Sequence, residues 1–119
     1  MTLARSRSIE PLLWLLFSAG GVLAALLLPI LMSLFALAIP LGWLMPPPHD
    51  HLLALLRHPL ARAGLFLLCT LSLFHWAHRF RYTLYDGLQI KQLDELIHVF
   101  CYGGAIAGSL LAAWILWTI

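Results

Sequence analysis

The chain has 119 residues, of which 62% are hydrophobic and only 10% are charged. Soluble domains contain about 45–50% apolar and about 25% charged residues, so this composition argues against a water-soluble protein. The net charge of +2 is too small to indicate a nucleic acid partner. At this length we expect a single domain, residues 1–119, with no room for both a membrane part and a soluble catalytic part.

The first predicted membrane-spanning helix covers about residues 12–40 and contains no charged side chain. A helix needs about 20 apolar residues to cross a bilayer, and this segment exceeds that length. Pro11 suits the first turn of a helix, where its missing N–H group is not needed. Pro29 lies inside the segment and predicts a kink, because proline removes one backbone hydrogen bond of the helix. Pro40 and Gly42 end the helix.

Two further predicted helices cover about residues 60–85 and 94–118. The third begins with Asp94 and Glu95, and negative charge is favoured at a helix N-terminus. The segment PPPHDH at residues 46–51 indicates a short rigid loop between the first two helices. The sequence therefore predicts an all-α integral membrane protein in contact with lipid, with three transmembrane helices, the first kinked at its internal proline.

Basic residues flank the predicted helices unequally, and the cytoplasmic segments of membrane proteins are enriched in lysine and arginine. Arg57 and Arg62 lie on one side of the membrane in a three-helix arrangement. The other side carries five basic residues: Arg5, Arg7, Arg79, Arg81 and Lys91. We therefore expect a multi-pass protein with a cytoplasmic N-terminus and a C-terminus outside, which in a bacterium would be the periplasm.

Small residues at four-residue spacing let transmembrane helices approach one another closely. Such pairs occur in the first predicted helix, at Gly21 and Ala25, and in the third, at Gly104 and Gly108. These residues either bring the helices of one chain together or contact a separate subunit, and the spacing alone is consistent with both.

The two cysteines, Cys69 and Cys101, each lie in an apolar run. Neither belongs to a CxxC motif or to a Cys/His spacing typical of metal ligands. We therefore expect buried, reduced thiols and no zinc or iron–sulfur site built by this chain alone.

Polar and aromatic residues concentrate in FHWAHRFRYTLYDG, residues 74–87, at the cytoplasmic end of the second predicted helix. One face of this helix carries polar side chains at helical spacing: His75, His78 or Arg79, Tyr82 and Asp86. Three interpretations are open. The residues form an interfacial anchor, or they bind a b-type haem through His75 or His78 with His98, or they line a quinone pocket.

A quinone pocket needs an apolar slot, hydrogen-bond donors for the carbonyl oxygens, and a proton carrier. His78 suits the last role, because histidine titrates near neutral pH. An arginine such as Arg79 stabilises negative charge on a reduced oxygen. Trp14 and Phe17 lie three residues apart on the first predicted helix, at the depth of His78. They would add an N–H donor and an aromatic wall.

An ordered set of motifs resembles the D-type hydrophobic anchor subunit of bacterial quinol:fumarate reductase. The most specific motif is E-P-x-x-W-x-x-F-x-A-G-G at residues 10–21. Further matches follow in order along the chain: Pro29, Pro40-Leu41-Gly42, His78-Arg79 with Asp86, and Tyr102-Gly103. The resemblance covers almost all of the chain after residue 9.

The resemblance implies a heterotetramer in which this subunit is not catalytic. A flavoprotein subunit with FAD reduces fumarate, and an iron–sulfur subunit carries electrons to it. This chain and a C-type membrane anchor hold both on the cytoplasmic face and form a haem-free menaquinol site. Carried over to this sequence, the quinone region includes Trp14, His78 and Arg79, with Phe17 and Asp86 as weaker candidates.

The sequence departs from the family after His78-Arg79, where further histidines are usual. Arg81 and Tyr82 stand there instead, so Tyr82 is a candidate hydrogen-bond donor where a histidine otherwise serves. Two alternative functions are a haem b-bearing succinate dehydrogenase anchor and a small membrane scaffold without a redox role. A transporter is disfavoured because the middles of the predicted helices carry no charge.

Overall fold

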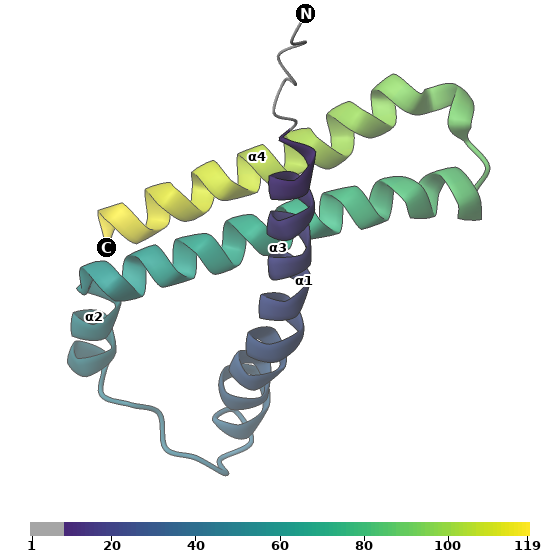
Figure 1. Cartoon of the computed structure of the whole chain (residues 1–119). Helices are drawn as coiled ribbons and strands as arrows, with labels where there is room; N and C mark the ends of the chain where they lie inside the picture. The colour runs from purple at the N-terminus through teal and green to yellow at the C-terminus, as the bar shows by residue number, and fades with distance from the viewer. Residues whose placement is uncertain (1–8) are drawn as a thin grey trace, which may run out of the picture.

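The computed structural model describes residues 9–119, which contain only helices and short connections. In chain order the elements are α1 (Glu10–Met32), a π-helical segment (Ser33–Ala38), α2 (His49–Arg57), α3 (Pro59–Gly87), a 3₁₀ turn (Lys91–Leu93) and α4 (Asp94–Thr118) (Figure 1). Three stretches are long and apolar enough to cross a membrane: Glu10–Ala38, Pro59–Gly87 and Lys91–Thr118. The predicted all-α architecture with three such helices is confirmed.

The predicted direction of the chain across the membrane rests partly on Arg5 and Arg7, which lie outside the described residues. The cytoplasmic N-terminus therefore stays a prediction.

The first long helix begins and ends with residues that suit those positions. Pro11 lies in the first turn of α1, as expected. One turn beyond Pro29 the backbone changes to the wider π-helical pattern, and Ile39 N–H donates to the Leu34 carbonyl oxygen at 3.0 Å. The turn that follows contains Gly42, whose φ of 77° is readily adopted only by glycine. The kink predicted at Pro29 stays a prediction.

A short helix, α2, occupies part of the segment expected to be a loop. The prolines at 46–48 have no regular structure, but the next three residues form the first turn of α2. The predicted loop was therefore wrong over His49–His51. α2 has only nine residues, too few for apolar periodicity to stand out in the sequence. Its last residue, Arg57, donates from Nε to the Ile119 carbonyl oxygen at 2.9 Å, which fastens α2 to the end of α4.

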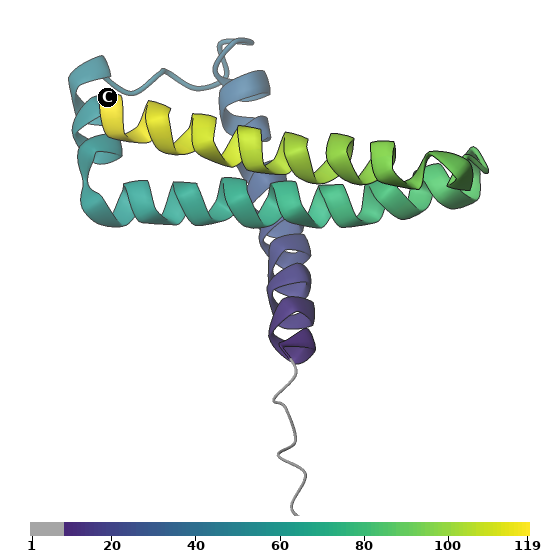
Figure 2. The ribbon, with the colours of Figure 1, turned by 90° about the horizontal axis from the view of Figure 1, so that it is seen from above.

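α3 and α4 form an antiparallel hairpin whose buried centre is made largely of small side chains (Figure 2). Ala77 of α3 and Cys101 and Ala105 of α4 have no exposed surface. A Cβ atom added at Gly108 would lie 2.8 Å from Leu73 Cδ1, so only glycine fits there without a shift of that side chain. Ala105 and Ser109 of α4 thus pack within this chain, whereas Gly104 is exposed and leaves contact with a separate subunit open. Both cysteines are free, but only Cys101 is buried; Cys69 is half-buried, so its predicted burial was wrong.

α1 crosses α3 near the middle of the hairpin instead of running alongside it, as Figures 1 and 2 both show. Gly20 is buried at the crossing, and a Cβ atom there would overlap the backbone carbonyl oxygen of Leu71. His75 Nδ1 of α3 donates to the Phe17 carbonyl oxygen of α1 at 2.9 Å. Much of the rest of α1 presents exposed apolar side chains. Close backbone packing and this hydrogen bond therefore help to hold α1 against α3.

Candidate functional site

Two adjoining cavities lie where the first turns of α1 face the second half of α3. The larger has a volume of about 610 Å³ and the smaller about 470 Å³. Trp14, Phe17 and His78 line both cavities. Three of the residues predicted for the site thus stand at the boundary that the two cavities share.

The shared boundary is a cluster of aromatic rings from α1 and α3. The Trp14 and His78 ring centres are 5.8 Å apart, with the rings edge to face. Phe17 packs against the same histidine at 4.7 Å and stacks on His75 at 4.3 Å. Trp14 and Phe17 also contact each other at 5.9 Å, as their spacing on one helix face predicts. Trp14 and His78 are therefore in contact where α1 meets α3, and their common depth in the membrane stays a prediction.

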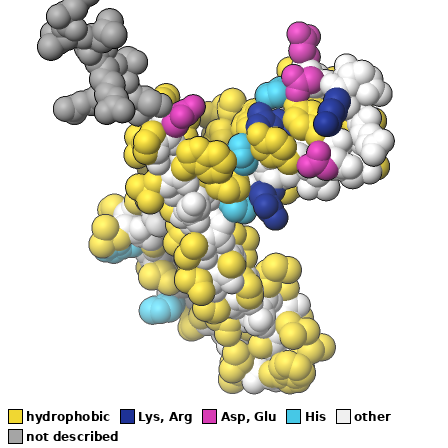
Figure 3. Space-filling view, turned by 45° about the vertical axis from the view of Figure 1, so that its right-hand side comes forward, with side chains coloured by type: hydrophobic (Ala, Val, Ile, Leu, Met, Phe, Trp, Pro, Cys, Tyr) yellow, Lys and Arg dark blue, Asp and Glu magenta, His cyan; other side chains and the backbone are white. Residues whose placement is uncertain are grey.

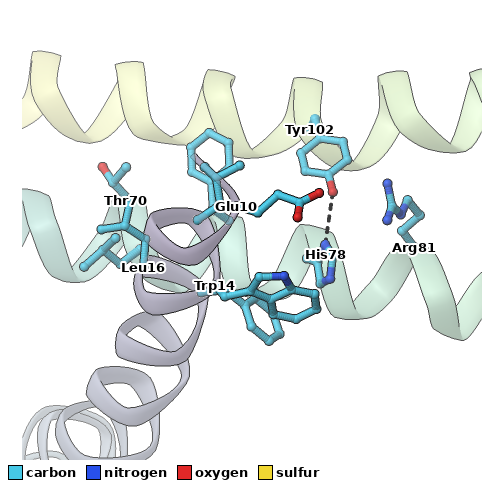
Figure 4. A pocket seen from close by; sticks show the side chains of 11 residues that line it. Glu10, Trp14, Leu16, Thr70, His78, Arg81 and Tyr102 are labelled. Carbon is cyan, nitrogen blue, oxygen red and sulfur yellow. Dashed lines mark hydrogen bonds between the residues drawn. The ribbon is translucent and has the colours of Figure 1, made fainter. Parts of the chain in front are cut away.

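The larger cavity is mostly apolar along its sides, and most of its polar side chains lie at one end, with Thr70 apart from them. Its apolar surface comes from Leu13, Leu16, Leu71 and Phe74 as well as the shared aromatic rings. His78 Nδ1 and the Tyr102 hydroxyl are 3.3 Å apart and join α3 to α4 by a hydrogen bond. In Figure 4 the Glu10 carboxylate points from α1 toward this pair, and Arg81 lies beside it.

The smaller cavity holds the other residues predicted for the site. Beyond the shared rings it is lined by Arg79, Tyr82, Thr83 and Asp86. Tyr82 packs against His78 at 5.1 Å between ring centres. Within residues 9–119 no ion pair joins Arg79 to Asp86, although both line this cavity. The expected polar stripe along α3 therefore exists, but Arg79 faces the smaller cavity.

Four polar residues of the larger cavity were not among the predicted site residues: Glu10, Thr70, Arg81 and Tyr102. Arg81 lies three residues after His78, so helical spacing places it on a neighbouring part of the same face. Glu10 and Tyr102 belonged to quoted family motifs. Glu10 and Tyr102 line the same cavity because of how α1 and α4 pack on α3. The motifs carry no information about that packing.

The remaining histidines of the polar region make contacts of their own. His75 lines neither cavity, since its ring stacks on Phe17. His98 Nε2 is 2.8 Å from a terminal nitrogen of Arg81, and its Nδ1 is 2.9 Å from the Asp94 carbonyl oxygen. Among the described residues, no group of three or more histidine, cysteine or acidic side chains is arranged to hold a metal ion.

Many charged and histidine side chains lie near the turn between α3 and α4, and a second group lies on α2 and the start of α3. Figure 3 shows the first group around the turn between α3 and α4 and the nearby start of α1, whereas the lower part of that view is almost entirely hydrophobic. The two cavities lie within this polar region. They combine an apolar slot with arginines, a histidine, tyrosine hydroxyls and a tryptophan N–H. Such a set can bind a flat apolar ring that carries oxygen atoms, and it can move protons.

Known proteins resemble this chain over almost its full length. The family model that describes the D subunit of fumarate reductase matches residues 4–117. The fumarate reductase D subunit of Mycobacterium tuberculosis (strain ATCC 25618 / H37Rv) is 53% identical over 115 residues, which cover 97% of this chain and 92% of that protein. That of Shewanella putrefaciens (strain CN-32 / ATCC BAA-453) is 34% identical over 113 residues, which cover 92% of each. The chain belongs to the family of fumarate reductase D subunits, whose members are membrane subunits of that complex.

Proposed function

We propose that this subunit anchors fumarate reductase to the bacterial inner membrane and forms part of its menaquinol site. It would not catalyse fumarate reduction itself. Together with a C-type anchor it would hold the flavoprotein subunit, which carries FAD, and the iron–sulfur subunit. The N-terminus and the α3–α4 turn would face the cytoplasm, because the basic residues near these segments favour that side.

The uncovered surface of α1 supports assembly with a second anchor. Leu26, Ile30 and Met32 are among many large apolar side chains of α1 that this chain leaves exposed. Helices that cross one bilayer usually tilt by about 20° on average, so they run closer to parallel than α1 and the hairpin do. The C-type anchor would hold the second half of α1 closer to the hairpin direction, and lipid would cover the rest.

The observation that carries the quinol site is the aromatic boundary between the two cavities. Trp14 and Phe17 of α1 enclose His78 of α3, and both cavities open beside that histidine. When bound, menaquinol supplies electrons to the iron–sulfur subunit and releases protons. Phe17 and Trp14 would bind the ring, with the Trp14 N–H as a donor. His78 would accept a proton.

The residues of the smaller cavity would assist at the same boundary. Arg79 would place positive charge near a quinol oxygen, and the Tyr82 hydroxyl would act as a donor or acceptor beside His78. Tyr82 stands where the family usually has a histidine, so the tyrosine would take the role of that histidine.

Loss of Trp14 or Arg79 tests this assignment. In membranes carrying the assembled complex, Trp14→Ala and Arg79→Leu are each expected to lower quinol oxidation by about tenfold, the effect of removing one hydrogen bond to a charged group or one ring of the wall. Fumarate reduction with a viologen dye, which donates electrons directly to the soluble subunits, should stay unchanged. If both variants assemble and oxidise quinol normally, the assignment of Trp14 and Arg79 to the quinol site is wrong.

The alternative with a b-type haem makes a different spectral prediction. His75 and His78 both pack on Phe17, and both ring nitrogens of His98 make contacts within the chain. We therefore expect the reduced-minus-oxidised visible spectrum of the purified complex to lack a b-type band. A band that disappears in His78→Phe would instead support the haem anchor.

The alternative of a scaffold without a redox role is tested by purification. A redox anchor should bring a flavoprotein and an iron–sulfur protein with it when the chain is purified from membranes in mild detergent. Isolation without either protein would favour the scaffold.

A further inference from the structure

A hydrogen-bonded line runs from the start of α4 to the larger cavity. The Tyr85 hydroxyl donates to the Asp94 carboxylate. His98 Nδ1 lies 2.9 Å from the Asp94 carbonyl oxygen and 3.2 Å from its carboxylate. His98 Nε2 lies 2.8 Å from a terminal nitrogen of Arg81, which lines the cavity. Tyr85, Asp94, His98 and Arg81 are thus separate from the aromatic rings of Trp14, Phe17 and His78 at the boundary between the cavities.

The direction of each hydrogen bond follows from the chemistry of arginine. A guanidinium group has only donors, so His98 Nε2 accepts from Arg81. His98 Nδ1 must then carry the proton, and it donates to the backbone carbonyl oxygen of Asp94, with the Asp94 carboxylate 3.2 Å away. The arrangement selects one neutral tautomer of His98. It also orients the ring, as a carboxylate does for a histidine that binds a metal.

The line ends with the Arg81 guanidinium between two tyrosine rings. Its central carbon is 4.6 Å from the centre of the Tyr82 ring and 5.7 Å from that of Tyr102. Its Nε atom is buried and makes no hydrogen bond within residues 9–119. The contact with His98 uses only one of the five N–H groups of the side chain. Donors therefore remain for an oxygen atom inside the cavity.

We propose that Arg81 binds an oxygen of the quinol in the larger cavity, and that His98 and Asp94 position it. This inference rests on the proposed quinol site and adds to it a second cation, Arg81, which lines the larger cavity as Arg79 lines the smaller one. Arg79 lines only the smaller cavity, whereas Arg81 lies beside the His78–Tyr102 pair (Figure 4). His98 and Asp94 are positioning residues, since they act through Arg81.

The contribution of His98 and Asp94 lies in orientation rather than in fold stability. Their side chains are 40% and 58% exposed, and exposed ion pairs contribute little to folding. A guanidinium on a long side chain has many rotamers, however, and each hydrogen bond that restricts it lowers the cost of binding an oxygen in one geometry. Substitution should therefore affect binding more than assembly.

The test measures binding of a fluorescent hydroxyquinoline N-oxide, an analogue with an acidic hydroxyl group, to the purified four-subunit complex. Arg81→Leu is expected to raise the Kd by about tenfold or more, because a hydrogen bond to a charged group is lost. His98→Phe keeps a ring against Tyr102 but removes both nitrogens, and should raise the Kd about fivefold. Arg81→Lys should restore part of the affinity but not all, since lysine lacks the fixed fork of donors.

The double variant distinguishes positioning from a separate structural effect. If His98 acts through Arg81, Arg81→Leu/His98→Phe should bind the probe no more weakly than Arg81→Leu alone. If the two effects were independent, the rises in Kd would multiply to about fiftyfold for the values above. That result would overturn the positioning role of His98. Glu95→Gln, next to Asp94 in the first turn of α4, is the control and should leave the Kd unchanged. Asp94→Asn keeps the backbone carbonyl that accepts from His98 Nδ1, so it should raise the Kd less than His98→Phe does.

Failure of this inference is separable from failure of the quinol site. If Trp14→Ala weakens probe binding while Arg81→Leu does not, Arg81 is not a ligand but the site stands. If neither substitution changes the Kd, the site itself is wrong. Fumarate reduction with a viologen dye, measured on each sample, shows that the complex is intact.

Discussion

Substitution of His78 by phenylalanine is expected to lower quinol oxidation by about 100-fold, the usual lower range for loss of a group that transfers a proton. The effect should be large because His78 lines both cavities. Phenylalanine keeps an aromatic ring against Trp14, Phe17 and Tyr82, so the wall should survive while the ring nitrogens disappear. The measurement is quinol-dependent fumarate reduction in membranes.

Two comparisons isolate the chemistry of that histidine. Tyr102→Phe removes only the hydroxyl that bonds His78 Nδ1, and should lower the rate by less than about tenfold, the value of one neutral hydrogen bond. His51→Phe, in the first turn of α2, makes the same exchange far from the cavities and should have no effect. Fumarate reduction with a viologen dye should be equal in all three variants.

A small effect of His78→Phe would contradict the proposed proton transfer. A rate within about threefold of the natural protein, with unchanged probe binding, would mean that protons leave through groups of the C-type anchor instead. His78 would then be only part of the aromatic wall. A rate that falls together with the amount of assembled complex would point to a structural role.

The helices were predictable from length and composition because a bilayer requires about 20 apolar residues in each. α3 begins at Pro59 and α4 begins at Asp94, close to the predicted residues. Proline and acidic residues mark helix N-termini by local chemistry, so these boundaries needed no tertiary contact. The nine-residue α2 was missed, since its contact to the chain end through Arg57 is long-range.

The crossing of α1 over α3 could not be read from the sequence. The pair Gly21 and Ala25 predicted a close approach, but spacing alone does not name the opposing residues, and it did not single out Gly20. In the structure those residues are Leu71 and His75. The direction of approach also depends on side-chain fit along both helices, which no local pattern encodes.

The candidate site was predictable where one helix supplies the residues. His78, Tyr82 and Asp86 share a face of α3 because of helical spacing, and the smaller cavity contains all three. The larger cavity draws instead on α1, α3 and α4 together. Tyr102 reaches His78 across the hairpin, and Arg81 is oriented by His98 from the other helix. Which cavity each arginine lines, Arg79 the smaller and Arg81 the larger, thus depends on the register of α4 against α3.

Substitution of Gly20 by leucine is expected to separate α1 from α3 and to remove both cavities together. A side chain at Gly20 would overlap the Leu71 carbonyl oxygen and lie 2.9 Å from its carbonyl carbon, and backbone cannot move aside cheaply. Overpacking of this kind costs about 1–3 kcal/mol or more, which is enough to change cellular abundance several-fold. The measurements are viologen-linked fumarate reduction in the membrane fraction and probe binding to the complex that remains.

Gly64→Leu on α3 is the matched control, because a Cβ atom there meets nothing within 4 Å in residues 9–119. It should leave membrane-bound activity unchanged. Equal losses in the two leucine variants would show that bulk at any glycine disturbs the complex. The close contact at Gly20 would then have no special role.

The neighbouring glycine separates a clash with backbone from a clash with a side chain. A Cβ atom at Gly21 would lie 2.5 Å from His75 Cε1, so Gly21→Ala should also weaken assembly. Here the opposing atoms belong to a side chain that can turn aside at the cost of its hydrogen bond to the Phe17 carbonyl oxygen, so the loss of membrane-bound activity should be smaller than in Gly20→Leu. Leu71→Ala should not rescue Gly20→Leu, because the atoms in the way are backbone. Rescue in the Gly20 case would mean that α1 approaches α3 through side chains, with room between the two backbones.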